Sequence, residues 1–240
     1  MIYSHVYDYR MAPPFMISHQ DSDPQPVERS DVFEIFPEKI GSYIFNHEHR
    51  TSLKQLCFYL IDKYKNNREH IRQSATGKLT HYFDPARSTS SLLDHPGFET
   101  FNNWIKRCSI DYINNTIGSN CEDVIITQCW INDCSKDGFQ KPHNHMNSLI
   151  SGTYYVNCTP EMHAPLTFNK PNIESAPYLR LGGTGERFAH IEPHDGILLL
   201  WESHLYHGYH SNDTDKRVSI SFNVVPETMP GMYGFKLTKK

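Results

Sequence analysis

The apolar positions between residues 50 and 117 recur at the spacing of an amphipathic helix in two segments. The first runs from Arg50 to Asn66 and the second from Phe98 to Ile117. Each has one apolar stripe: Leu53, Leu56, Cys57, Leu60 and Tyr64 in the first, and Phe98, Phe101, Trp104, Ile105, Cys108, Tyr112 and Ile113 in the second. Gly118 follows the second segment, as expected at a helix end. We expect two helices that pack against another layer.

The pattern changes after Gly118 to short segments rich in β-branched and aromatic residues, with turn residues between them. Six such segments predict strands: Val124–Ile131, Leu149–Asn157, Leu166–Asn169, Arg187–Glu192, Gly196–Glu202 and Arg217–Val225. No long helical pattern interrupts them. The sequence therefore predicts a mostly β protein of α+β class, an antiparallel sandwich or jelly roll whose two main helices precede it and support it.

These patterns divide the chain into four regions of one domain. Residues 1–35 are rich in Pro, Ser, Asp and His and are typical of an extended arm. Residues 36–118 form a helical support region, residues 119–226 the β core, and residues 227–240 a C-terminal tail. The Gly-rich segment 172–190 is either a lid over a site or a plain connection between strands.

Composition narrows the classes of protein to consider. The chain has 240 residues, a net charge of −4, 38% hydrophobic and 21% charged residues, which is typical of one soluble domain. The negative charge argues against nucleic acid as the main partner. No apolar run is long enough to cross a membrane, and the N-terminal residues do not resemble a signal peptide, so we expect a cytoplasmic protein. The six cysteines, including the loosely spaced Cys129 and Cys134, are then expected to be buried reduced thiols.

The strongest candidate for chemistry is the sequence "KPHNH" at residues 141–145. On a strand or at its edge, His143 and His145 would point the same way, since side chains alternate along a strand. Imidazole is a common ligand of transition metals. The chain has fifteen histidines, so this pair alone proves little. A metal would also need a third ligand from elsewhere.

The C-terminal segment supplies further candidates. It holds His204, His207 and His210, followed by a strand in which polar and apolar residues alternate. The apolar set is Val218, Ile220, Phe222 and Val224, and the polar set is Arg217, Ser219, Ser221 and Asn223. A strand whose polar face meets solvent would show the same pattern. A polar inner face could instead hold a carboxylate, which arginine binds in bidentate fashion.

Together, "HNHMNSLISGTYYV" and "GILLLWESHLYHGYHSNDTDKRVSISFN" resemble the Fe(II)- and 2-oxoglutarate-dependent oxygenases. In particular, they resemble a family that is common in phages and marine bacteria. The resemblance spans about residues 36–226, with weaker matches near Phe36–Pro37, Ser88–Asp94 and Cys129–Asn132. It implies a double-stranded β-helix, or jelly roll, that uses Fe(II), 2-oxoglutarate and O2. The implied dioxygenase hydroxylates an unidentified substrate and releases succinate and CO2.

The resemblance also assigns roles to individual residues. His143 and His207 correspond to iron ligands, and Arg217 to the anchor of the distal carboxylate of 2-oxoglutarate, with Ser219 beside it. Tyr155 is a second contact for that carboxylate. Asn223 and Trp130 are expected to line the barrel near the cosubstrate.

His145 departs from the broader superfamily, which usually has a carboxylate at this position. His145 could ligate in a neutral three-histidine site, stand beside a two-histidine iron, or leave the third position to a more distant acid. We favour ligation by His145. A neutral ligand leaves one more positive charge on the metal, which strengthens its attraction for anionic 2-oxoglutarate.

Two other classes of protein fit parts of the pattern. A cupin-like three-histidine metalloenzyme also uses His–x–His, but it expects a nearby glutamate and has no general need for Arg217. A non-enzymatic jelly-roll protein would leave the polar face of residues 217–223 exposed to solvent. The sequence does not identify the substrate, and it leaves the oligomeric state open, a homodimer included. For a phage-encoded chain the location would be the host cytoplasm.

Overall fold

The computed structural model describes residues 38–88, 90–169, 188–229 and 234–237. The predicted arm at residues 1–35 and residues 172–187 of the predicted lid or connection lie outside these described residues. Among the helices in the described part of the chain, none is long and apolar enough to cross a membrane.

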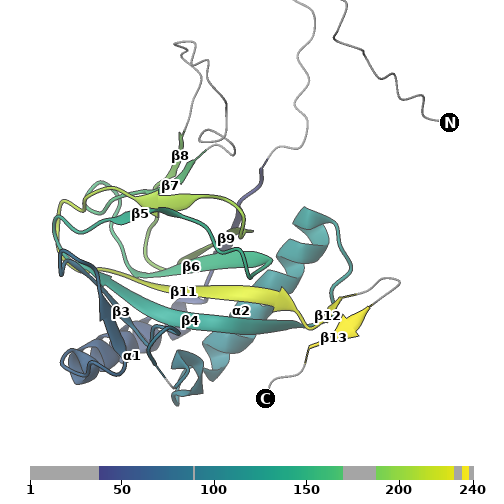
Figure 1. The fold of residues 1–240 in the computed structure, drawn as a ribbon, viewed down its shortest axis with the longest axis horizontal. Coiled ribbons are helices and arrows are strands. Elements are labelled where there is room, and N and C mark those ends of the chain that lie inside the picture. The colour runs from purple at the N-terminus through teal and green to yellow at the C-terminus, as the bar shows by residue number, and fades with distance from the viewer. Residues whose placement is uncertain (1–37, 89, 170–187, 230–233, 238–240) are drawn as a thin grey trace, which may run out of the picture. The chain divides into compact units, whose positions relative to one another are not determined.

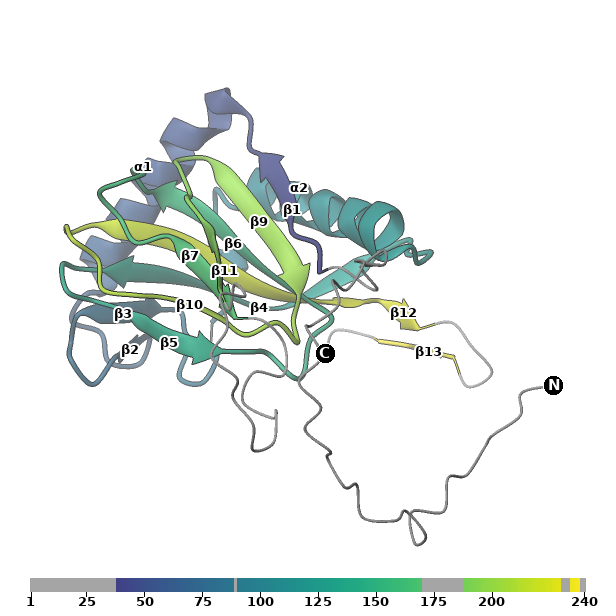
Figure 2. The same ribbon diagram turned by 90° about the horizontal axis from the view of Figure 1, so that it is seen from above.

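Two antiparallel sheets face each other in residues 38–240 (Figures 1 and 2). The major sheet has the order β1 (Gly41–Ile44), β9 (Ile197–Glu202), β6 (Ile150–Asn157), β11 (Arg217–Pro226), β4 (Val124–Cys134), β3 (Leu79–Tyr82) and β2 (Ile71–Gln73). The minor sheet has the order β5 (Gln140–His143), β10 (His207–Tyr209), β7 (Leu166–Asn169) and β8 (Phe188–Ile191). A small hairpin, β12 (Thr228–Met229) with β13 (Phe235–Lys236), follows β11. The fold is a jelly roll, as predicted.

Both predicted helices lie against the outer face of the major sheet (Figure 1). Helix α1 (His47–Tyr64) begins three residues earlier than predicted, because the Asn46 side chain caps it by accepting a hydrogen bond from the backbone N–H of Glu48 at 2.9 Å. Helix α2 (Glu99–Asp111) continues into a π-helical turn at Tyr112–Ile117, and Gly118 ends it in the left-handed conformation. A short 3-10 turn, Leu92–Asp94, precedes α2.

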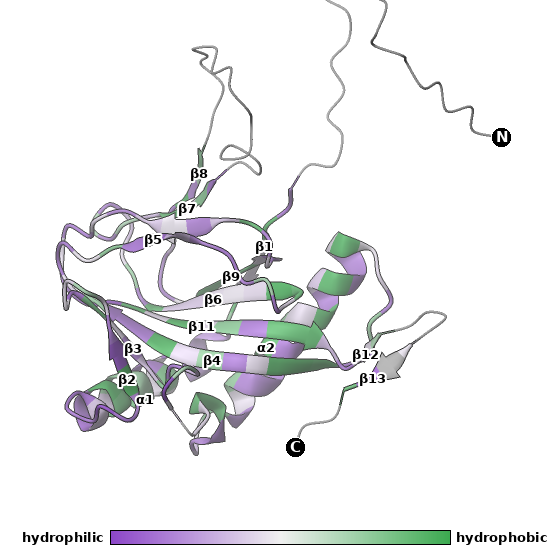
Figure 3. Cartoon of the chain, in the orientation of Figure 1, coloured by the Kyte–Doolittle hydropathy of each residue, from purple (hydrophilic) through white to green (hydrophobic). Residues whose placement is uncertain are grey.

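Apolar and polar residues alternate along β11, so its two faces meet two different parts of the interior (Figure 3). The apolar set of β11 is fully buried against the helices, in a core that also contains Leu53, Cys57, Phe101 and Ile105. Strand β9 is apolar on both faces because it contributes to two cores. Its residues Leu198 and Leu200 face the helices, whereas Leu199 and Trp201 join a second core between the sheets. The polar set of β11 faces this inter-sheet space, where Arg217, Ser219 and Asn223 are buried and Ser221 is partly buried.

The structure confirms the six predicted strands and the two predicted helices, with ends that differ by a few residues. Strands β1, β2 and β3 were not predicted. They have only three or four residues each, and β1 and β2 stand at the two edges of the major sheet, so no clear alternation marks them. The region 36–118 thus contributes three strands to the sheet as well as the helices.

Candidate metal centre

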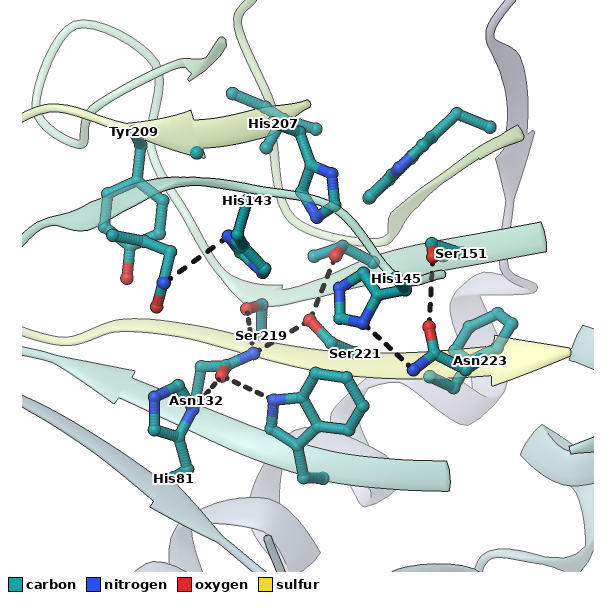
Figure 4. Close-up of a pocket in the computed structure, with 18 of the residues that line it drawn as sticks. His81, Asn132, His143, His145, Ser151, His207, Tyr209, Ser219, Ser221 and Asn223 are labelled. Atoms are coloured by element: carbon teal, nitrogen blue, oxygen red, sulfur yellow. Dashed lines mark hydrogen bonds between the residues drawn. The ribbon is translucent and has the colours of Figure 1, made fainter. Parts of the chain in front are cut away.

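A cavity lies between the two sheets (Figure 4). Candidate residues predicted from the sequence line this cavity on both sheets. The minor sheet and the adjoining loop provide the three histidines, and the major sheet provides the polar rows of β6, β4 and β11. All of the candidate residues line it: Trp130, His143, His145, Tyr155, His207, Arg217, Ser219 and Asn223.

His143, His145 and His207 meet in this cavity. One nitrogen of each ring lies within 4.8 Å of a nitrogen of the other two. The centroid of the His143 ring lies 4.5 Å from that of His207 and 5.0 Å from that of His145. Among the described residues, this is the only group of three histidines, cysteines or acids close enough to hold one ion. Imidazoles in this arrangement suit a transition metal such as iron.

Strand pairing brings two of these histidines together. His143 is the last residue of β5, and it lies directly opposite His207 of β10 in the antiparallel pair. His145 lies beyond the end of β5, so it does not share a strand face with His143. Its position is set by its backbone N–H, which donates to the Ser203 carbonyl at 2.9 Å.

Backbone carbonyls fix the tautomers of His143 and His207. The Nδ1 of His143 lies 3.0 Å from the Lys141 carbonyl oxygen, closer than the 3.5 Å to the Gln140 amide nitrogen, and the Nδ1 of His207 lies 2.9 Å from the Leu205 carbonyl oxygen. A carbonyl can only accept, so each Nδ1 carries the proton and each Nε2 keeps a free lone pair. Metal-binding histidines are held by such outer hydrogen bonds, so both rings are prepared as Nε2 ligands.

Burial keeps the three imidazoles neutral. It lowers the pKa of His207 to about 3 and that of His145 to about 4, and the neighbouring His143 contributes in both cases. Burial also lowers the pKa of His143. A neutral imidazole is the form that binds a metal, so the site presents its ligands near neutral pH without losing protons.

No described residue that lines the cavity is acidic. The described part of the chain therefore offers no carboxylate to complete a two-histidine site, which was one of the three alternatives for His145. Of the other two histidines in the C-terminal segment, His204 is exposed and approaches Glu38 at 3.4 Å, and His210 is also exposed.

Arg217 is the only charged side chain among the described residues that line the cavity. It is 2% exposed, and no carboxylate of a described residue lies within ion-pair distance of it. Its Nε donates to the Ala164 carbonyl at 3.2 Å, and Nη2 approaches the Tyr155 hydroxyl at 3.5 Å. Of the five N–H groups of a guanidinium, three remain for a ligand. A buried, unpaired cation is costly, so this arrangement fits an anion that enters the cavity.

Tyr209 was not identified from the sequence. The centroid of its ring lies 3.9 Å from Cζ of Arg217. Among the described residues its buried hydroxyl has no oxygen or nitrogen partner and interacts only with the weakly hydrogen-bonding thiol of Cys134. The indole N–H of Trp201, whose ring packs against His207, is likewise buried and unpartnered. The spacing of His207 and Tyr209 was an available signal, since residues i and i+2 of a strand share a face.

A hydrogen-bonded polar network forms the floor of the cavity (Figure 4). The indole N–H of Trp130 donates to Asn132 Oδ1 at 2.9 Å, which fixes the orientation of that amide. The same oxygen lies 2.7 Å from Nδ1 of His81, so His81 must carry its proton there. Asn132 Nδ2 donates to Ser219 at 3.2 Å and Ser221 at 2.9 Å. Nε2 of His81 is left as an acceptor at the cavity wall.

Gly208 lets strands β5 and β10 approach each other. A Cβ at this position would lie 2.5 Å from the Gln140 carbonyl oxygen and 3.0 Å from the Pro142 nitrogen, and both are backbone atoms. A side chain would therefore push apart the two strands that carry His143 and His207.

The polar residues of β11 do not form a solvent-exposed strand face, which was one of the two interpretations of their alternation. Arg217, Ser219 and Asn223 are each at most 2% exposed, so this face of β11 is an interior wall and does not meet solvent as a simple surface strand would. The six cysteines are all free and buried, as predicted.

Comparison with known proteins agrees with this geometry. Residues 128–223 match the model of a family described as "Putative 2OG-Fe(II) oxygenase". No curated protein matches the chain significantly in sequence.

Three solved structures illustrate the fold similarity. HygX from Streptomyces hygroscopicus, with nickel and 2-oxoglutarate bound, has a TM-score of 0.53 at 12% identity over 79% of this chain and 83% of its own. A Pseudomonas putida prolyl-4-hydroxylase has a TM-score of 0.52 at 13% identity, covering 79% and 93%. The α-ketoglutarate-dependent epimerase SnoN of nogalamycin biosynthesis has a TM-score of 0.58 at 11% identity, covering 84% and 87%.

At these identities the structural similarity concerns the fold, and the family match concerns residues 128–223. These residues contain the three-histidine cluster, the buried arginine and the strands that hold them. The matched part of the chain and the fold are both those of 2-oxoglutarate- and Fe(II)-dependent oxygenases.

Proposed function

We propose that His143, His145 and His207 hold the catalytic Fe(II), and that Arg217 anchors 2-oxoglutarate beside it. The observation that carries the proposal is the pairing, in one cavity, of a neutral three-histidine cluster with a buried guanidinium that has no carboxylate partner in the described chain. The first group suits a transition metal, and the second suits the far carboxylate of a dicarboxylic acid.

The residues around Arg217 fit that carboxylate well. The guanidinium lies over the Tyr209 ring and approaches the Tyr155 hydroxyl, and Ser219 follows Arg217 along the polar face of β11. The Tyr209 hydroxyl, which has no oxygen or nitrogen partner among the described residues, would donate one hydrogen bond, and Arg217 would donate a bidentate pair. In this assignment, binding of 2-oxoglutarate satisfies groups that the metal-free protein leaves without partners.

Charge also favours this cosubstrate. Three neutral imidazoles leave the full +2 charge on the metal, whereas a carboxylate ligand would reduce it. The added attraction acts on the keto acid end of 2-oxoglutarate, and Arg217 acts on the other end. With iron, 2-oxoglutarate and O2 bound, the site supplies oxidation of a substrate together with conversion of 2-oxoglutarate to succinate and CO2.

The substrate that is oxidised remains to be identified. The floor formed by His81, Asn132 and Trp130 is polar and uncharged, with Nε2 of His81 available as an acceptor. A substrate that reaches this floor would meet it through a neutral hydrogen-bond donor such as a hydroxyl or amide. Asn223 and Trp130 line the opposite end from Arg217, near His145.

Several finer expectations remain proposals. We also propose that residues 36–118 support a catalytic core at residues 119–226, that the protein is cytoplasmic, and that it is related to proteins of phages and marine bacteria. Free, buried thiols at all six cysteines fit a reducing compartment.

Uncoupled turnover tests the proposal without a known substrate. The metal-free protein is supplied with Fe(II), 2-oxoglutarate, ascorbate and O2, and succinate is measured. We expect succinate from the wild type and none from His207→Ala, whereas His204→Ala, which changes an exposed histidine outside the cavity, keeps the wild-type rate. Equal succinate from all three proteins would contradict the proposed ligands.

A further inference from the structure

His145 differs from the other two histidines in what holds its ring. Its Nδ1 lies 3.2 Å from Asn223 Nδ2, which is the donor end of that amide. The lone pair on Nδ1 accepts this hydrogen bond, so the proton of the neutral ring is on Nε2. In this tautomer the nitrogen that would face a metal carries hydrogen. His143 and His207 have the opposite tautomer, because each donates to a backbone carbonyl.

The hydrogen bonds around Asn223 can run in either direction. Its Oδ1 accepts from the Ser151 hydroxyl at 3.0 Å, and its Nδ2 also donates to Gln128 Oε1 at 2.6 Å. Ser151 in turn contacts the Ser203 hydroxyl at 2.9 Å. These partners are hydroxyls or an amide, and each can donate or accept. Among the residues that the structure describes, no backbone carbonyl or indole N–H bonds the side chains of Asn223, Gln128 or Ser151 and fixes the direction, in contrast to Asn132, which Trp130 holds in one orientation.

Reversal of this network preserves its hydrogen bonds. After the Asn223 and Gln128 amides both rotate, Asn223 Nδ2 donates to Ser151, and Asn223 Oδ1 accepts from Gln128 Nε2 and from Nδ1–H of His145. Three contacts to Asn223 exist before the change and three after it. The reversed network leaves a free lone pair on Nε2 of His145.

We infer that Asn223 is a positioning residue that decides whether His145 ligates the metal. In the metal-free protein its amide keeps His145 in the Nε2–H tautomer, so the site offers two prepared ligands. Metal binding at the third position requires reversal of the Asn223, Gln128 and Ser151 network. This inference rests on the proposed three-histidine site and adds the residue that controls its third ligand.

The tautomers can be read by NMR of protein labelled with ¹⁵N at histidine, with Zn(II) alone as a redox-inactive probe. Long-range ¹H–¹⁵N spectra distinguish Nδ1–H from Nε2–H in a neutral ring. We expect Nδ1–H for His143 and His207 in the metal-free protein and Nε2–H for His145. After Zn(II) is added, all three rings should show a protonated Nδ1 and a metal-bound Nε2.

Substitution of Asn223 tests whether this residue controls the tautomer of His145. In Asn223→Asp the carboxylate can only accept, so His145 should be Nδ1–H before metal is added, and Zn(II) should bind about tenfold more tightly, as expected for an outer-shell partner. Asn66→Asp makes the same chemical change at an exposed residue after α1 and should leave both the tautomer and the Zn(II) affinity unchanged.

The possible outcomes separate the inference from the proposed function. If His145 is already Nδ1–H in the metal-free wild type, or if Asn223→Asp leaves its tautomer unchanged, the inference is wrong. If Zn(II) binds His143 and His207 while His145 remains Nε2–H, the inference of a reversal fails but a two-histidine site survives. If Zn(II) shifts none of the three rings, the proposed metal centre itself fails.

Discussion

Replacement of Arg217 by methionine should remove 2-oxoglutarate binding without destabilising the metal-free protein. The guanidinium is 2% exposed and has no carboxylate partner among the described residues. Burial of an unpaired ion costs several kcal/mol, whereas methionine fills a similar volume with no charge. Loss of the hydrogen bond to the Ala164 carbonyl costs about 1–3 kcal/mol. We expect the free energy of unfolding to stay the same or to rise by about 1–2 kcal/mol.

The effect on 2-oxoglutarate should be large. A buried pair between a guanidinium and a carboxylate contributes about 2–5 kcal/mol, and a loss of about 3 kcal/mol corresponds to roughly 150-fold weaker binding. A ligand at 100 times its Kd stabilises the folded state by about 2.7 kcal/mol. The same concentration would stabilise Arg217→Met by only about 0.3 kcal/mol. Urea unfolding of the Zn(II)-loaded proteins, with and without 2-oxoglutarate, measures both quantities.

Arg72→Met is the matched control, because Arg72 has the partner that Arg217 lacks. Its Nε lies 2.7 Å from Asp84 Oδ2, and the Asp84 side chain is 5% exposed. This substitution leaves a buried carboxylate unpaired and should lower stability by about 1–2 kcal/mol, while stabilisation by 2-oxoglutarate stays near 2.7 kcal/mol. If Arg217→Met instead loses more than 2 kcal/mol and is still stabilised by 2-oxoglutarate like the wild type, Arg217 is a structural residue and the reasoning is wrong.

Four further predictions concern the histidine site and its surroundings. His207→Ala should abolish binding of Fe(II) in an anaerobic equilibrium titration, whereas His204→Ala should bind like the wild type. Tyr209→Phe removes a buried hydroxyl that has no oxygen or nitrogen partner among the described residues and that would donate to 2-oxoglutarate, so the Kd for 2-oxoglutarate should rise about tenfold, measured by calorimetry, while thermal stability stays unchanged or rises. Gly208→Ala places a Cβ against the Gln140 carbonyl and should push β5 and β10 apart. The free energy of unfolding, measured in urea, should fall by about 1–3 kcal/mol, and Zn(II) binding should weaken at least tenfold. Burial lowers the pKa of His207 to about 3 in the folded protein, against about 6.5 in the unfolded chain, so its contribution to stability is present above pH 6.5 and is lost as the pH falls. At pH 5 this histidine alone should cost the metal-free protein about 2 kcal/mol, and His207→Ala should show a shallower pH dependence in urea unfolding.

The elements that the sequence predicted are those with a long, regular pattern. The alternation from Arg217 to Val224 predicted both a strand and its two faces, because each face is buried in a different environment. The stripe of the second predicted helix was equally clear. Strands β1, β2 and β3 are short, and what places them is pairing with β9 and β4, which are distant in sequence. Such long-range pairing leaves little local signal.

In the candidate site, too, residues with a local sequence signal were predicted and those placed by long-range contacts were not. His143 and His207 were recognisable from motifs and from their resemblance to a family, and the structure places them opposite each other in one strand pair. His145 was named with them, but its tautomer could not be predicted, because it depends on a hydrogen bond to Asn223, which is 78 residues away. Trp201 and His81 were missed, since only the closure of the two sheets brings them to one cavity, and Tyr209 was missed although its spacing from His207 was a signal.

An anaerobic titration tests the central claim most directly. Fe(II) is added to the metal-free protein, followed by 2-oxoglutarate, and the weak visible charge-transfer band of the iron chelate is followed. We predict a saturable band with one equivalent of iron in the wild type, and its loss in Arg217→Met although iron still binds. Iron binding without any band in the wild type would contradict the assignment of this cavity to 2-oxoglutarate.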